Sequence, residues 1–274
     1  MKVLILGAAG MAGHVVDRFL LGRGYNVVTH ARNSLFIDAA YTEDLYENPK
    51  ALEAIISREL PEVIINCAGV LVEASKNSPH IAAYINAYLP HLLVHMGSIH
   101  GFKIVHISTD CVFSGRDGSY HESSTKDEIT PYGLSKSLGE IINSRDCTIR
   151  TSIVGPELKP HGSGLLAWFL RQTGTIQGYL NAYWNGITTL ELAKFIEKVI
   201  TENIAGITNL SASQTVSKFE LLQIFKKTYN HDIQINPHEL KKPINKSLIM
   251  TRADVGYEQQ QIPAMLTEMR NWYE

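Results

Sequence analysis

Short apolar runs recur along the first 153 residues, separated by stretches in which hydrophobic and polar positions follow a helical period. Each run is nearly continuous instead of alternating, which is typical of strands buried on both faces of a parallel sheet. The segments between them are amphipathic and long enough to be crossover helices. We expect strands at 2–7, 26–32, 61–69, 102–108 and 147–153, and helices at 11–24, 49–60 and 80–101.

This alternation of strand and helix predicts an α/β fold with a doubly wound parallel sheet of the Rossmann type. After about Gly155 the rhythm loosens, because a loop of Gly, Pro and charged residues is followed by less regularly spaced amphipathic segments. These features predict a smaller C-terminal lobe that is partly interleaved with the large domain. We assign 1–154 and about 186–202 to the sheet domain, and about 155–185 and 203–274 to the lobe.

Composition narrows the classes of function. The chain has 274 residues and a net charge of −2; it has no basic stripe for nucleic acid, and no apolar run reaches the ~18 residues of a membrane-spanning helix. Cys67, Cys111 and Cys147 are odd in number and lack CxxC spacing, which predicts neither a disulfide framework nor a zinc site. His91 and His95 form the only i, i+4 histidine pair and have no acidic partner of the HExxH kind, so we expect no metal. A reducing cytoplasm is the default location.

A glycine-rich turn, "GAAGMAG", lies between the first strand and the first helix. Gly7, Gly10 and Gly13 permit a tight turn and a close approach of the backbone to a pyrophosphate, whose charge meets the N–H groups of the helix N-terminus. We therefore expect a dinucleotide site in the sheet domain, with Met11 and Ala12 also at the cofactor. The alternative is a sharp strand-to-helix turn that binds no ligand.

The end of the second strand reads "THARNS", with no acidic residue to accept a hydrogen bond from an adenosine ribose. Arg32 stands there instead, and a basic residue suits the 2′-phosphate of NADP(H), so we expect NADP(H) in preference to NAD(H). In the alternative interpretation Arg32 is simply a solvated residue at a strand end. Asp38 either lies near the adenine or caps the next helix.

A catalytic group is indicated by "PYGLSKSLGE", in which Tyr132 and Lys136 lie at i, i+4 on one helix face. A neighbouring ammonium and an oxidised nicotinamide would both lower the pKa of the tyrosine, which is near 10 when unperturbed. Thr109 ends a strand 23 residues earlier, where open α/β sheets bind ligands. Its hydroxyl could hold a substrate carbonyl while Tyr132 supplies the proton, whereas Ser108 alternates to the opposite side of the strand.

These motifs together resemble the extended short-chain dehydrogenases, and within them the dTDP-4-dehydrorhamnose reductase group. The resemblance covers essentially the whole chain. It includes the glycine turn, "VIINCAG" with Cys67, Ala68 and Gly69 beside the cofactor, "ISTDCVFSG" and the catalytic helix. In the second half, "NGITTLELAKFI", "GITNLSASQTVSKFELL" and "KKPINKSL" are similar to segments of that group.

The resemblance implies NAD(P)H-dependent reduction of the 4-keto group of a nucleotide-linked 6-deoxysugar, in the synthesis of a surface-polysaccharide precursor. It implies that Thr109 holds the C4 oxygen, Tyr132 supplies its proton, and Lys136 binds the nicotinamide ribose and tunes Tyr132. The lobe would bind the nucleotide-sugar. Further expected contacts are Ser108, Tyr132 and Lys136 with the cofactor, and Asp110, Val112, Phe113, Asn181 and Trp184 with the substrate.

The chain departs from the group at Cys111, which replaces a tyrosine, near Val70–Leu71, and in the loop 155–164. A dTDP-linked sugar and a UDP-linked N-acetylamino deoxysugar both remain open, and so does any need for a divalent metal. We interpret Cys111 as a small packing residue and not a nucleophile. Two other functions are kept: a non-catalytic nucleotide-binding regulatory subunit, and a nucleotide-sugar epimerase. Helices with apolar outer faces are compatible with a homodimer.

Overall fold

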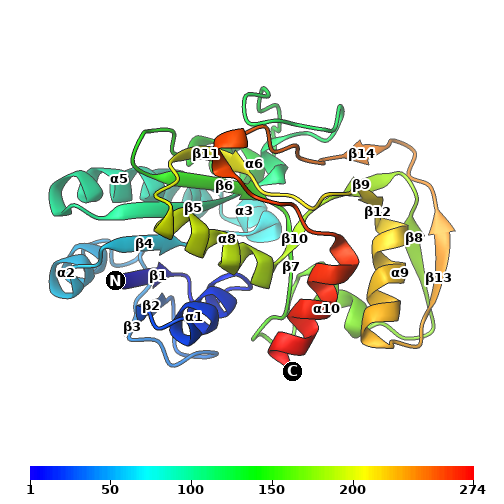
Figure 1. Cartoon of the computed structure of the whole chain (residues 1–274), viewed down its shortest axis with the longest axis horizontal. Helices are drawn as coiled ribbons and strands as arrows, with labels where there is room; N and C mark the ends of the chain where they lie inside the picture. The colour runs from blue at the N-terminus through cyan, green and yellow to red at the C-terminus, as the bar shows by residue number, and fades with distance from the viewer.

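Seven parallel strands form the large sheet, in the order β11-β6-β5-β4-β1-β2-β3 (Figure 1). This computed structural model describes residues 1–274. The order confirms the doubly wound sheet predicted from the apolar runs. The strands are β1 (Lys2–Leu6), β2 (Asn26–Ala31), β3 (Tyr41–Thr42), β4 (Val63–Asn66), β5 (Lys103–Thr109), β6 (Cys147–Thr151) and β11 (Gly206–Asn209).

The sheet is buried on both faces, and its first strand is apolar at four successive positions. In β1, Val3 and Ile5 belong to one hydrophobic cluster, while Leu4 and Leu6 belong to another on the opposite face. Helices α1 (Gly13–Gly22) and α8 (Thr189–Thr201) supply the first cluster; α2 (Lys50–Glu59) and α5 (Leu89–His100) supply the second. Each fully buried Val, Leu or Ile side chain stabilises the fold by about 1.5–3 kcal/mol before entropy is counted.

The helical stretch predicted at 80–101 is interrupted by a π-helical turn. The chain passes through α3 (Val72–Asn77), α4 (Pro79–Ala82) and the π turn η1 (Ala83–Tyr88) before α5 begins. The catalytic segments follow as the 3-10 turn η2 (Asp110–Val112) and helix α6 (Pro131–Leu138). Both lie at the carboxyl end of β5, the edge where open α/β sheets bind ligands.

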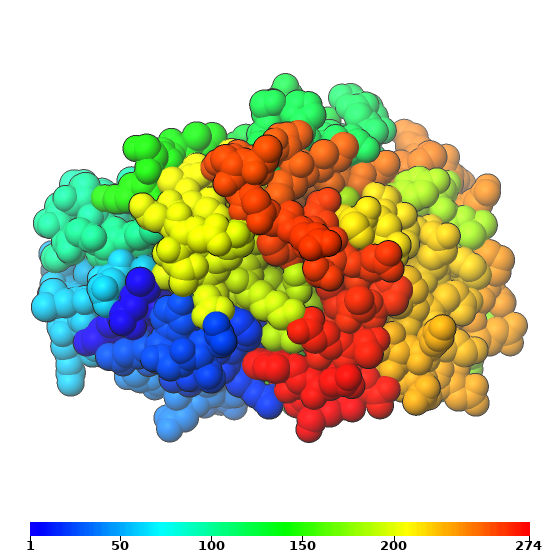
Figure 2. Space-filling view, in the orientation of Figure 1, coloured from blue at the N-terminus to red at the C-terminus, as the bar shows by residue number.

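A smaller lobe lies beside this sheet edge (Figure 1). Strand β8 (Thr175–Tyr179) pairs with β13 (Gln234–His238), and β9 (Ala182–Trp184) lies between β12 (Val216–Ser217) and β14 (Ile244–Asn245). The remaining elements are β7 (Ile153–Val154), α7 (Leu165–Leu170), β10 (Ile187–Thr188), α9 (Lys218–Tyr229), the 3-10 turn η3 (Ala253–Val255) and α10 (Ile262–Tyr273). In Figure 2 the C-terminal segment, coloured red, runs across the junction between the sheet domain and α9.

The interleaving of the two parts is wider than the sequence predicts. The chain returns from the lobe at β10 and α8, near the predicted residue 186, but it stays in the sheet domain through β11 at 206–209. The predicted boundary at about 202 is therefore too early, because β11 is a four-residue edge strand that gives only a weak apolar signal. None of the helices combines the length and the apolar character that a bilayer-spanning segment requires.

Candidate active site

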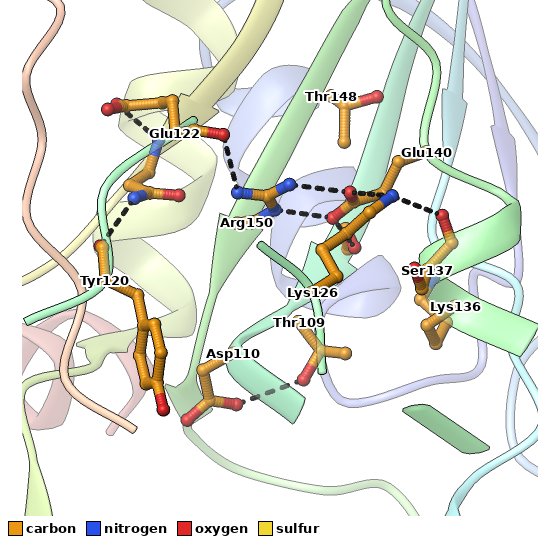
Figure 3. Close-up of polar contacts among 12 residues, drawn as sticks. Thr109, Asp110, Tyr120, Glu122, Lys126, Lys136, Ser137, Glu140, Thr148 and Arg150 are labelled. Atoms are coloured by element: carbon orange, nitrogen blue, oxygen red, sulfur yellow. Dashed lines mark hydrogen bonds and ion pairs between the residues drawn. The ribbon is translucent and has the colours of Figure 1, made fainter. Parts of the chain in front are cut away.

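The turn after β5 holds the Thr109 hydroxyl in place. Thr109 is the N-cap of η2, and its Oγ1 accepts a hydrogen bond from the Cys111 N–H at 3.1 Å. The same hydroxyl donates to Asp110 Oδ1 at 3.1 Å (Figure 3). Redirecting this donor from Asp110 to a substrate carbonyl needs only a rotation of the O–H bond, which fits the role predicted for Thr109.

Ser108 points to the other side of the strand, as the alternation along β5 predicts. Its hydroxyl is buried and donates to Glu140 Oε1 at 2.9 Å. Ser108 thus belongs to a buried ionic network behind the strand, and its contact with a cofactor stays a prediction.

That network is built around a fully buried ion pair between Glu140 and Arg150 (Figure 3). The guanidinium donates to both carboxylate oxygens, at 2.6 and 2.8 Å, and Lys126 Nζ lies 3.0 Å from Glu140 Oε2. Burial alone would raise the pKa of Glu140, but Arg150 outweighs it and the pKa is lowered. Glu140 is therefore a stable anion directly behind Ser108.

Helix α6 presents Tyr132 and Lys136 to β5. Thr130 caps the helix, its Oγ1 accepting from the Gly133 N–H at 3.3 Å, and Pro131 occupies the first helical position. Lys136 is buried, and its Nζ donates to the Ile107 carbonyl of β5 at 2.6 Å. The predicted i, i+4 pair therefore lies on the face of α6 that meets the catalytic strand.

The pKa of Tyr132 differs from the sequence-based expectation. Burial raises it, the charges of Cys111 and Asp110 raise it further, and the Thr109 side chain acts in the opposite direction. The expected lowering by Lys136 is wrong for the chain without cofactor, because that ammonium is directed at the Ile107 carbonyl. The phenol consequently stays protonated at neutral pH, the state that a proton donor requires.

Lys136 itself is perturbed by its surroundings. Burial lowers its pKa to about 8, while Glu140 and Cys67 act in the opposite direction. Its Nζ also lies 3.4 Å from Nε2 of His106, a fully buried ring whose pKa burial holds well below the usual range. The ammonium therefore contacts an imidazole and a carbonyl, while Glu140 acts on it without forming an ion pair.

The glycine turn forms the cradle expected for a dinucleotide. Gly7 has a φ of 79°, and a Cβ there would lie 2.7 Å from Ala68 N. A Cβ on Gly13 would clash with the Gly7 carbonyl oxygen. Helix α1 has neither a capping side chain nor an acidic residue in its first turn, so its N-terminus suits an anion. The residues present fit the diphosphate of a nicotinamide dinucleotide.

The other predicted cofactor residues surround this turn. Cys67, Ala68 and Gly69 follow β4, and the Cys67 N–H donates to the Leu6 carbonyl at 3.0 Å, which fixes the segment beside the turn. Met11 contacts the loop 155–164 at Gly164. Gly10 lies in the turn itself, and Arg32 and Asp38 follow β2. The side chains of Arg32 and Asp38 are exposed and make no hydrogen bond or ion pair.

Several predicted substrate residues have partners within the protein. Val112 and Phe113 are 1% and 0% exposed and form a small apolar cluster with Tyr120 and Leu248. Asn181 is held by both backbone groups of Leu240, at 2.9 and 2.8 Å. All three side chains are therefore engaged in packing or hydrogen bonds, and their contact with a substrate stays a prediction.

The remaining candidate residues are Asp110, Trp184 and Cys111. Asp110 is 8% exposed, and burial raises its pKa. Trp184 is also buried, its Nε1 donating to Ser152 Oγ at 2.9 Å, while one face of its ring meets Lys218. Burial raises the pKa of the Cys111 thiol to about 12, which supports its interpretation as a packing residue and not a nucleophile.

Comparison with known proteins assigns the chain to a family. A family model described as "RmlD substrate binding domain" matches residues 1–255. The chain belongs to this family. A probable low-salt glycan biosynthesis reductase of Haloferax volcanii is 31% identical over 144 residues, which cover 51% of this chain and 48% of the relative. The match thus spans about half the length of that curated relative.

Solved structures of the same fold cover nearly all of this RmlD-family chain or the whole of it. A hypothetical dTDP-4-dehydrorhamnose reductase from Sulfolobus tokodaii is 30% identical with a TM-score of 0.81, covering 94% of this chain and 96% of that one. A dTDP-4-dehydrorhamnose reductase from Bacillus anthracis, solved with NADP, has a TM-score of 0.85 at 21% identity, covering 100% and 99%. The second likeness concerns the fold alone.

Two polar residues of this RmlD-family chain escaped the sequence analysis. Asn86, on the π turn η1, accepts from the Val70 N–H at 2.8 Å and donates to Ser135 Oγ at 3.1 Å, joining the loop after β4 to α6. Glu43 directly follows β3, and its Oε2 is buried without a partner. Neither gives a sequence signal, since a π turn and a two-residue strand have no recognisable hydrophobic period.

Proposed function

We propose that the protein is an NAD(P)H-dependent reductase that converts the 4-keto group of a nucleotide-linked 6-deoxysugar to a hydroxyl, for a surface-polysaccharide precursor. One observation carries this proposal: Tyr132 is half-buried and its raised pKa keeps it protonated, the Thr109 side chain acts on that pKa, and Lys136 lies on the same helix face. Membership of the RmlD family and the glycan reductase relative support the substrate class.

In this proposal each residue of the chain has one task. The Thr109 hydroxyl turns from Asp110 to the C4 carbonyl oxygen and polarises it. Tyr132 transfers its phenolic proton to that oxygen as C4 is reduced. The nicotinamide cofactor, when bound, supplies the hydride. Lys136 binds the nicotinamide ribose, and its positive charge stabilises the phenolate that the proton transfer leaves behind.

NADP(H) is the proposed cofactor in preference to NAD(H). Arg32 follows β2, where the adenosine ribose lies in dinucleotide-binding folds, and its exposed guanidinium has no partner in the protein. Glu43, beside it through the pairing of β3 with β2, offers an unpaired carboxylate oxygen that suits the exocyclic amine of adenine. The NADP found in the Bacillus anthracis neighbour fits this preference.

We extend the proposal to location and assembly. All three cysteines are free thiols, which suits a reducing cytoplasm. Leu134, Leu138 and Ile142 expose 47%, 69% and 69% of their surfaces, an apolar stripe that would suit a homodimer contact.

The decisive test is a panel of dTDP-, UDP- and GDP-linked 4-keto-6-deoxysugars, each assayed with NADPH and with NADH. Oxidation of the reduced cofactor with at least one of these sugars, and none without a sugar, is the expected result. An epimerase would instead interconvert sugars without net consumption of cofactor. A regulatory subunit would bind nucleotide and turn over no member of the panel.

A further inference from the structure

Two lysines of the smaller lobe lie on either side of one short strand that faces the catalytic turn. Ser217 of β12 and Asn245 of β14 both pair with Tyr183 of β9. Lys218 directly follows the first of these residues, and Lys246 directly follows the second. The strand pairing therefore places two lysines that are 28 residues apart in the chain directly after the two strands that flank β9.

The charges of both lysines affect the pKa of Asp110, the first residue of the turn η2. Lys218 and Lys246 are the cations that oppose the rise in the pKa of Asp110, and Asp110 and Cys111 in turn act on both lysines. Tyr132 is influenced by the same two residues of the turn. The two lysines and the proposed proton donor therefore share Asp110 and Cys111 as neighbours that affect their pKa values.

The partners of Lys218 and Lys246 supply too little negative charge to neutralise both ammonium groups. Lys246 Nζ is 3.1 Å from Glu128 Oε2, while Glu128 Oε1 accepts from the backbone N–H groups of Ile129 and Thr130. Lys218 makes no hydrogen bond or ion pair and lies 5.1 Å over the Trp184 ring. Burial lowers the pKa of Lys218 to about 8.

A half-buried ammonium that has lost hydration without gaining an acceptor is destabilising unless a ligand supplies the acceptor. The aromatic face of Trp184 compensates for only part of this loss, since a cation–π contact contributes about 0.5–2 kcal/mol. Asp110 affects the pKa of both lysines but forms an ion pair with neither of them.

We propose that Lys218 and Lys246 form an anion site that binds a phosphate or carboxylate group of the substrate, opposite Tyr132 and Thr109. The inference rests on the proposed function, because it takes the nucleotide-sugar as the molecule that carries the anion. Two sources have this chemistry: the diphosphate of the nucleotide, and a carboxylate on the sugar. In either case the site would fix the sugar relative to the catalytic hydroxyls.

The test is calorimetric titration of the full-length chain with UDP, uridine, UDP-glucose and UDP-glucuronate, and with the dTDP counterparts of the first two. The variants are Lys218→Met and Lys246→Met, with Lys218→Arg to restore the charge. Lys227→Met, an exposed lysine on the same helix α9, is the matched control. NADPH affinity is measured for every variant and should stay within about twofold of wild type, which verifies that the sheet domain is folded.

For a diphosphate ligand, Lys218→Met weakens nucleoside diphosphate binding by about tenfold or more, the usual effect of losing one charge-assisted contact, and leaves uridine binding unchanged. For a sugar carboxylate, the variant instead abolishes the preference for UDP-glucuronate over UDP-glucose. Lys218→Arg recovers affinity in both cases. Unchanged affinity for all ligands in both methionine variants overturns the anion site. If that happens while wild type still reduces a 4-keto sugar, the proposed function survives; a wild type that turns over no such sugar refutes both.

Discussion

Ser108 and Thr109, neighbours on β5, direct their hydroxyl groups to opposite sides: Ser108 to Glu140 at 2.9 Å, and Thr109 to Asp110 at 3.1 Å. One step along the strand therefore separates a side chain of the buried ionic network from the one that we propose to be catalytic. The pair also provides a matched set of variants, because both side chains carry a hydroxyl group and lie at neighbouring positions of β5.

Thr109→Val should reduce kcat by about 10²–10³-fold, the usual effect of removing a hydrogen-bond donor to a reacting oxygen. Ser108→Ala should leave kcat within about threefold of wild type and lower the free energy of unfolding by about 1 kcal/mol, since Glu140 keeps its other partners. Steady-state kinetics and urea unfolding of both variants check this. Equal losses of kcat in the two variants would contradict the claim that only the Thr109 hydroxyl takes part in the reaction.

The buried ion pair behind the strand should dominate stability. Arg150→Met leaves Glu140 buried with less compensation, and we expect a loss of about 3–5 kcal/mol in urea unfolding. The control is Arg23→Met, which removes the solvent-exposed pair of Arg23 with Glu197 and should cost less than about 1 kcal/mol. Similar costs for the two variants would contradict the stabilising role of the network.

Gly13→Ala should weaken NADPH binding by more than about tenfold, because its Cβ would clash with the Gly7 carbonyl in the phosphate turn. Gly22, at the end of the same helix, has open space around its Cα, so Gly22→Ala should leave binding unchanged and stabilise the helix by about 0.5–1 kcal/mol. Fluorescence titration of NADPH separates the two cases. Full cofactor affinity in Gly13→Ala would argue against the cradle.

Arg32→Ala should raise KM for NADPH by about tenfold and alter KM for NADH little, because only the 2′-phosphate would contact the guanidinium. Parallel kinetics with both cofactors measure the difference. An equal change in the two KM values would remove the basis for preferring NADP(H).

The buried ammonium of Lys136 makes stability depend on pH. Its pKa is about 8 in the folded chain and 10.5 in the unfolded reference, so between these values the unfolded chain binds more protons. Folding is therefore favoured progressively as the pH rises from 8 to 10.5. Unfolding free energies at pH 7.5 and 10 should show wild type gaining relative to Lys136→Met, whose side chain does not titrate. If the difference in unfolding free energy between the two proteins is the same at both pH values, the pKa of Lys136 is not lowered in the folded chain.

The sequence predicted the parts of the fold that depend on local pattern. The continuous apolar runs identified the parallel strands, and glycine spacing and the i, i+4 spacing of Tyr132 and Lys136 marked the two halves of the site. What it missed depends on distant partners. Asn181 is satisfied by Leu240, 59 residues away, and Phe113 packs on Leu248, so both look available for a ligand until the lobe is seen to close around them.

The direction of the Tyr132 pKa shift failed for a related reason. The spacing correctly places Lys136 on the same helix face, but only the fold reveals that its ammonium donates to Ile107 and that burial dominates the phenol. Local sequence specifies which residues meet; desolvation and competing acceptors depend on everything packed around them.

The most direct test of the account is the single-turnover rate of Tyr132→Phe with NADPH and the best 4-keto sugar of the panel. The variant lacks only the phenolic hydroxyl group, so the account predicts a rate at least about 10²-fold below wild type, with unchanged affinity for NADPH. A rate close to that of wild type would contradict the role of Tyr132 as the proton donor and, with it, the proposed mechanism.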